Sequence, residues 1–101
     1  MTKLWPSKDP EEIITVTFDF TDDLNGAAIT GGSAVTSVSV AEGADQDYAQ
    51  TKNGAEEIQG AKVLQSVKLG LNGVNYRWQG KINTSDGRTL VLAAILPVRE
   101  A

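Results

Sequence analysis

An all-β fold is predicted by three features of this 101-residue chain. Short runs of β-branched and aromatic residues recur along it, and in most of them apolar and polar residues alternate, as in a strand with one buried face. Turn-forming residues such as Asn72-Gly73 separate the runs, and no segment shows the 3.6-residue period of a helix. About seven short strands of this kind predict an antiparallel β-sandwich of immunoglobulin-like type around one core.

The first eleven residues (1–11) are predicted to form an extended arm, and residues 12–101 a single domain. Prolines follow Trp5 and Asp9, and a proline biases the residue before it towards an extended backbone. Two roles for Trp5 remain open: a plug that packs on the domain's own edge, or an anchor that docks with Pro6 on a neighbouring subunit. If the second is correct, removing residues 1–10 should leave a folded domain that no longer assembles.

Two strands are expected in the first half of the chain, over residues 12–20 and 34–40. The second has a thinly apolar face, which favours a position towards a sheet edge. Residues 24–29 between them suggest a weak strand or a kinked segment. Residues 41–61 form the longest irregular stretch, and because a long structureless loop is unusual in a compact domain, we expect a short strand or turn there with Tyr48 pointing inward.

Three further strands follow in the last third of the chain, over residues 62–71, 74–83 and 88–96. The middle strand alternates almost without error and places Tyr76 and Trp78 in the core. The Asn72-Gly73 turn before it suits either a tight hairpin or a corner where the chain crosses to the other sheet and a tyrosine bonds back to the backbone. We prefer the corner, which leaves residues 84–88 as the hairpin between the last two strands.

The last strand is apolar on both faces. Leu90, Leu92, Ala94 and Leu96 line one face, and Val91, Ala93 and Ile95 line the other. Because the outer face of a terminal strand should meet water in a small two-layer domain, the second apolar face is either covered by the chain's own arm or loop, or forms a subunit interface. The candidate interface residues are therefore Trp5, Pro6, Val91, Ala93 and Ile95.

The residue content argues against catalysis. The chain has no Cys and no His, which removes thiolate metal ligands, disulfides and the usual general base. Its Ser and Thr residues alternate along strands, and its paired carboxylates sit beside turns, where solvated roles are expected. Asp45 and Asp47 lack the further ligands at fixed spacing that a calcium loop needs. We therefore expect a non-enzymatic protein without a cofactor or metal.

Charge and hydropathy limit the partners. Thirteen acidic and nine basic residues give a formal charge of −4, which argues against nucleic acid and anionic membranes as partners. No apolar run approaches the roughly 18–20 residues that a membrane span needs, and residues 1–8 lack the apolar stretch of a signal peptide. Synthesis in a cytoplasm is expected.

Both ends of the chain carry motifs. Residues 5–12 read W-P-S-K-D-P-E-E and lead directly into the strand-like I-I-T-V-T-F-D-F. Near the other end stand Gly70, Gly73 and Tyr76, then T-S-D-G-R at residues 84–88 and a final apolar strand. These motifs resemble those of small tailed-bacteriophage virion proteins of the Ig-like fibre-tail adaptor or head–tail accessory type. Residues 41–61 depart from that pattern.

This resemblance implies a non-enzymatic virion structural protein, made in the host bacterial cytoplasm. It would work by placement on the tail, baseplate or head, with one surface fixing it there and another meeting a further tail, fibre or capsid protein. A homo-oligomer in the particle is expected. Two alternatives are a capsid decoration protein and a module that binds host-surface glycans, for which Trp5, Tyr48 and Trp78 are the aromatic candidates.

Overall fold

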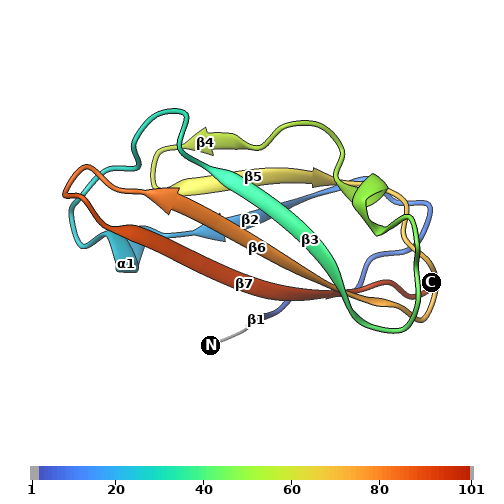
Figure 1. The fold of residues 1–101 in the computed structure, drawn as a ribbon. Coiled ribbons are helices and arrows are strands. Elements are labelled where there is room, and N and C mark those ends of the chain that lie inside the picture. Colours follow the sequence, from blue (N-terminus) through green and yellow to red (C-terminus); the bar gives the residue numbers. More distant parts are fainter. Residues whose placement is uncertain (1–2, 101) are drawn as a thin grey trace.

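The computed structural model describes residues 3–100, which form two β-sheets packed face to face (Figure 1). One sheet has the strand order β1-β7-β6-β3 and the other the order β2-β5-β4. The strands are β1 (Lys3–Leu4), β2 (Ile14–Asp19), β3 (Val35–Glu42), β4 (Glu57–Gln59), β5 (Lys62–Val67), β6 (Asn75–Asn83) and β7 (Thr89–Pro97). These seven strands and two sheets confirm the all-β prediction.

Two short helices lie in the connections, α1 (Thr21–Leu24) and the 3-10 helix η1 (Tyr48–Thr51). Within residues 3–100, no helix has the length and apolar character needed to cross a membrane. Among the strands that the structure describes, β3 pairs with β6 alone and so lies at a sheet edge, as its thin apolar face predicts.

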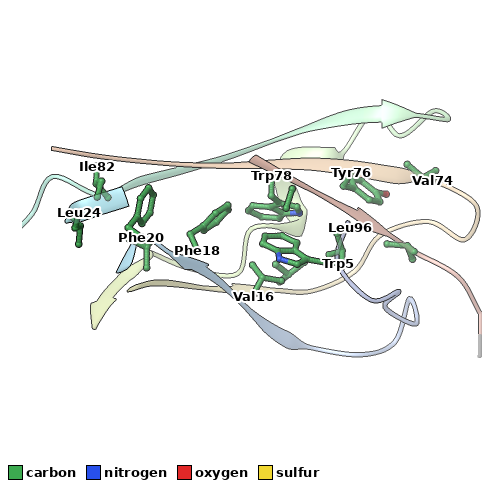
Figure 2. Close-up of a cluster of buried hydrophobic side chains, with 14 residues drawn as sticks. Trp5, Val16, Phe18, Phe20, Leu24, Val74, Tyr76, Trp78, Ile82 and Leu96 are labelled. Atoms are coloured by element: carbon green, nitrogen blue, oxygen red, sulfur yellow. The ribbon is translucent and has the colours of Figure 1, made fainter. Parts of the chain in front are cut away.

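The core lies between the two sheets, where β6 contributes Tyr76, Trp78 and Ile82 and β2 contributes Val16 and Phe18 (Figure 2). Tyr76 and Trp78 of β6 are 1% and 0% exposed, which confirms the face predicted from their alternation. Gly80 continues the same face without a side chain, and Phe18 of β2 fills the space. A Cβ at Gly80 would lie 2.8 Å from Cγ of Phe18, so this glycine is required for the two sheets to approach closely.

The chain crosses between the sheets at the predicted corner. β5 belongs to the three-stranded sheet and β6 to the four-stranded one. The backbone N–H of Leu71 donates to the Tyr76 hydroxyl at 2.9 Å, and that hydroxyl donates to Oδ2 of Asp45 at 2.6 Å. Burial, together with the bond to Asp45, raises the pKa of Tyr76 to about 12. The residues 84–88 turn joins β6 to β7 as an antiparallel hairpin, as predicted.

Three residues that were expected to point inward are exposed instead: Tyr48, and Leu69 and Leu71 at the end of the predicted strand over residues 62–71. β5 ends at Val67, and Leu69 has a left-handed backbone with φ of 58°, so strand alternation stops there and Leu69 and Leu71 are each 50% exposed. Tyr48 begins η1 and is 40% exposed. The buried residue of that turn is Thr51, whose hydroxyl donates to the Tyr48 carbonyl at 2.6 Å.

The arm lies against the edge of the four-stranded sheet. β1 pairs in parallel with β7, and the Trp5 N–H donates to the Ile95 carbonyl at 2.9 Å. The Trp5 side chain is 8% exposed and meets the Phe18 ring edge-on, with ring centroids 5.2 Å apart. Trp5 therefore packs on its own domain, the first of the two roles considered for it, and Figure 2 shows its ring within the core.

Lys8 fastens the arm at its far end. Its side chain is completely buried, and Nζ donates to the carbonyls of Leu69, Asp9 and Pro10 at 2.7, 2.8 and 3.4 Å. Burial lowers the pKa of Lys8, and the nearby carboxylates of Glu12 and Asp9 oppose that shift. Because Trp5 and Lys8 are both buried, the arm packs against the core of the domain. Whether residues 12–101 fold without the arm remains a prediction.

Candidate interface on the outer face of the four-stranded sheet

An apolar stripe runs along the outer face of the four-stranded sheet. Val91 is 47% exposed, while Ala93 and Ile95 on the same face of β7 are partly exposed. Leu4 pairs with Ile95 in parallel register, so its side chain emerges on this face, where it is 70% exposed. We call Leu4, Val91, Ala93 and Ile95 the apolar stripe.

Cationic side chains flank the stripe. Across β6, Arg77 lies opposite Ile95 and Lys81 lies opposite Val91. Neither cation forms an ion pair within residues 3–100, where the two ion pairs join other residues. Val35 of β3, which is 55% exposed, lies on the far side of Lys81. A chain with a net negative charge thus presents an apolar and locally cationic face.

The five residues predicted from sequence fall into two groups. Val91, Ala93 and Ile95 lie in the apolar stripe, and the exposure of Val91 shows that the arm leaves it uncovered. Trp5 and Pro6 lie elsewhere, beside a hollow of about 410 Å³ between the arm and β2. The structure therefore does not bring all five together, and whether either group is an interface remains a prediction.

Leu4 was missed in the sequence because a two-residue strand has no period to reveal which side chain faces out. The only available signal was that it stands beside Trp5. Two adjacent residues in an extended segment point to opposite sides, so an inward Trp5 requires an outward Leu4.

Two carboxylates beside turns, Asp45 and Asp86, are engaged in local structure. Asp45 accepts the Tyr76 hydroxyl with one oxygen and the Asp47 N–H, at 2.9 Å, with the other. Asp86 accepts hydrogen bonds from the Thr84 hydroxyl and the Arg88 guanidinium, and these bonds lower its pKa. They also connect the two ends of the β6–β7 turn. Among the described residues, no group of three or more acidic side chains could hold a metal ion.

The fold and this surface define a small two-sheet β module with an apolar, cationic outer face. Residues 8–97 match the family described as podophage GP4 fiber-tail adaptor protein gp77, and the chain belongs to this family. It is thus a bacteriophage virion structural protein of the tail-adaptor class, which confirms the predicted resemblance. The match runs through residues 41–61, where that resemblance was weakest. No curated protein and no solved structure matches the chain.

Proposed function

We propose that this protein is an immunoglobulin-like, non-enzymatic module that links tail and fibre proteins of the phage particle, and that the apolar stripe is one of its binding surfaces. The observation that carries the proposal is the exposed row of Leu4 and Val91 beside two cations, Arg77 and Lys81, that form no ion pair within residues 3–100. Folding needs only one apolar face per sheet, so a second apolar face calls for a partner.

The immunoglobulin-like part of the proposal is supported by the connections between the sheets. A tyrosine near the start of β6 accepts a backbone N–H five residues upstream, at the point where the chain changes sheets. A bond of this kind is a hallmark of immunoglobulin-like sandwiches. The sheets contain four and three strands, which also fits a seven-stranded sandwich of that type.

The partner that suits the stripe has apolar and acidic side chains together. Apolar contact would cover Val91 and Leu4, and carboxylates would meet Arg77 and Lys81. A protein surface on the tail or fibre fits this description, because the family is one of fiber-tail adaptors. Several copies of the chain, made in the host cytoplasm, would occupy equivalent positions around the tail.

The glycan-binding alternative depended on exposed aromatic rings. Trp5 and Trp78 are 8% and 0% exposed, so Tyr48 is the remaining candidate of the three. A single exposed ring does not make a stacking platform. The capsid alternative has no comparable support, because the family is named for the tail.

The test compares one charged substitution on each outer face. Val91→Glu places a carboxylate opposite Lys81, and Leu64→Lys places an ammonium opposite Glu57 on the three-stranded sheet. Each new charge faces an opposite one, so both variants should fold. In the encoding phage, we expect the copies of the Val91→Glu protein per purified particle to fall at least tenfold and those of Leu64→Lys to stay at the wild-type level.

Copy number is measured by mass spectrometry against the major capsid protein, and thermal melting of the purified variants controls for folding. Wild-type incorporation of a folded Val91→Glu protein would exclude the apolar stripe as a binding surface. An equal loss for both variants would mean that any charge on the outside prevents incorporation, and would also count against the stripe.

A further inference from the structure

A groove runs along the open side of the sandwich, between the arm and β2. Its larger part, of about 410 Å³, is lined on one side by the arm and on the other by four consecutive residues of β2. A second hollow of about 180 Å³ shares Lys3, Trp5 and Thr17 with the first. We call the two together the arm groove. Trp5 lies between them, with apolar Ile14, Val16 and Leu96 beside the larger hollow.

The β2 side of this groove is an open strand edge. The Phe20 N–H donates to the Ala61 carbonyl at 2.9 Å, at the end of the β2–β5 pairing. Because main-chain groups alternate along an antiparallel strand, those of Val16 and Phe18 also face β5, whereas those of Thr15 and Thr17 face away from it. Among residues 3–100, no strand pairs with β2 on that side.

We propose that the arm groove binds an extended segment of another virion protein, which adds a strand to the free edge of β2. Its backbone would bond to the N–H and C=O groups of Thr15 and Thr17, as in other cases of strand addition. Every second side chain would enter the groove beside Trp5 and be apolar. Lys3 lies next to both hollows, but Glu12 lines the larger one and Asp19 the smaller one, so the lining carries both signs of charge and the affinity must come from main-chain bonds and apolar contact.

The position of the arm indicates that the groove accepts one extended segment rather than a second complete domain. The arm lies opposite β2, so the β2 edges of two complete domains could pair only if both arms moved away. The arm is fixed by the bonds from Trp5 and Lys8 to β7 and by the burial of both side chains. A single extended segment can enter the groove without detaching the arm from β7. The inference depends on the proposed linking function only for the source of this segment.

The first test is photo-crosslinking in the particle. Thr17 is replaced by p-benzoylphenylalanine, and Gln59 is the matched control because it is also exposed on an edge strand of the same sheet, at β4. After irradiation of purified particles, we expect position 17 to crosslink to one segment of a different virion protein, with alternating apolar residues. Crosslinks to a second copy of this chain, or no excess over position 59, would overturn the proposal.

The second test leaves the groove unmodified. The amide hydrogens of Thr15 and Thr17 should exchange rapidly in the isolated protein and at least a hundredfold more slowly in the particle, because an added strand would bond to them. Equal exchange in both states would overturn strand addition even if a crosslink formed. Neither readout uses the apolar stripe, so failure of the Val91→Glu test and failure of this proposal remain distinguishable.

Discussion

The two outer faces of the sandwich differ in chemistry although both are built from alternating strands. The three-stranded sheet presents mainly polar side chains: Thr15, Thr17, Asp19, Glu57, Gln59, Lys62 and Ser66. Among them Asp19 lies opposite Lys62, and Leu64 is the apolar interruption. The four-stranded sheet instead presents the apolar stripe beside Arg77 and Lys81.

The polar face shows what folding requires of this chain, since one apolar side per sheet suffices to build the core. The stripe exceeds that requirement. A contiguous exposed apolar row along one sheet is therefore better explained by a partner than by a generally hydrophobic composition. Matched variants on the two faces can show whether the stripe is dispensable for stability, whether a bond between the sheets joins the faces, and whether the charges on the faces are equivalent.

The largest expected effect is a difference in the free energy of unfolding between variants at two adjacent residues of the arm, Trp5 and Leu4. Trp5→Ala should lower the free energy of unfolding by about 3–5 kcal/mol, because it empties a core position next to Phe18. Leu4→Ala, at the outward neighbour, should change it by less than about 0.5 kcal/mol. Urea unfolding of both variants measures this difference. A comparable loss in Leu4→Ala would mean that the stripe serves folding, and the contrast between the faces would disappear.

A smaller effect is expected at the bond that joins the two sheets. The buried Thr36 hydroxyl of β3 donates to Oε1 of Gln65 in β5 at 2.5 Å. Thr36→Val keeps the shape but leaves that oxygen without its donor, which should cost about 1–3 kcal/mol. Ser37→Ala, on the outer face of the same strand, is the matched control and should stay within about 0.5 kcal/mol. If both variants melt like the wild type, this bond does not hold the sheets together.

The tyrosine at the crossing predicts a pH dependence. Its pKa is raised from 10.0 to about 12 in the folded state, so the unfolded chain loses this proton first as pH rises. Stability from Tyr76 is therefore fully present below about pH 10 and is lost as pH rises from 10 towards 12. Tyr76→Phe should cost about 0.5–1.5 kcal/mol at neutral pH and flatten the decline.

Melting temperatures measured between pH 8 and pH 11.5 would show this loss of stability. The decline should begin near the ordinary tyrosine pKa of about 10 and extend over on the order of two pH units. Tyr48→Phe, at the exposed tyrosine of η1, is the matched control and should keep the wild-type profile. An unchanged slope in Tyr76→Phe would assign the alkaline decline to other groups.

The smallest effect concerns the cations beside the stripe. Arg77→Gln or Lys81→Gln should each weaken attachment by no more than about 1 kcal/mol, because exposed charge pairs contribute little. The variant proteins should nevertheless leave purified particles at a lower NaCl concentration than the wild type does. Lys62→Gln, on the opposite outer face, should be released as the wild type is. If all three variants leave the particle at the same NaCl concentration, the charges of this face do not contribute to binding of the partner.

Periodicity in the sequence was sufficient where the strand runs the full length of the alternating pattern, but not in residues 62–71, where β5 ends at Val67 and leaves Leu69 and Leu71 exposed. β2 and β6 could be oriented from alternation alone, and Tyr76 could be assigned to the crossing because an aromatic residue followed Asn72-Gly73 at the right distance. The doubly apolar character of β7 directed attention to Val91, Ala93 and Ile95. Each of these inferences depends on local patterns.

What could not be predicted depends on long-range contacts. Nothing near Trp5 indicates that Phe18 lies beside it, or that two residues of the arm pair with β7. A lysine is normally solvated, so the convergence of three carbonyls on Lys8 had no signal in the sequence. The arm groove likewise results from the separation of two segments in space, which no residue pattern encodes.

Lys8 has a consequence for how the arm stays attached to the domain. Proteins often bring carbonyl oxygens together around a bound inorganic ion, which dilution or a chelator can remove. Here the positive charge at the junction of the arm and the loop after β5 is tethered to the polypeptide itself. This cation cannot be diluted away or removed by a chelator, so the junction does not depend on the metal-ion content of the surrounding water. A virion protein that leaves the cell thereby carries its own donor for these carbonyls.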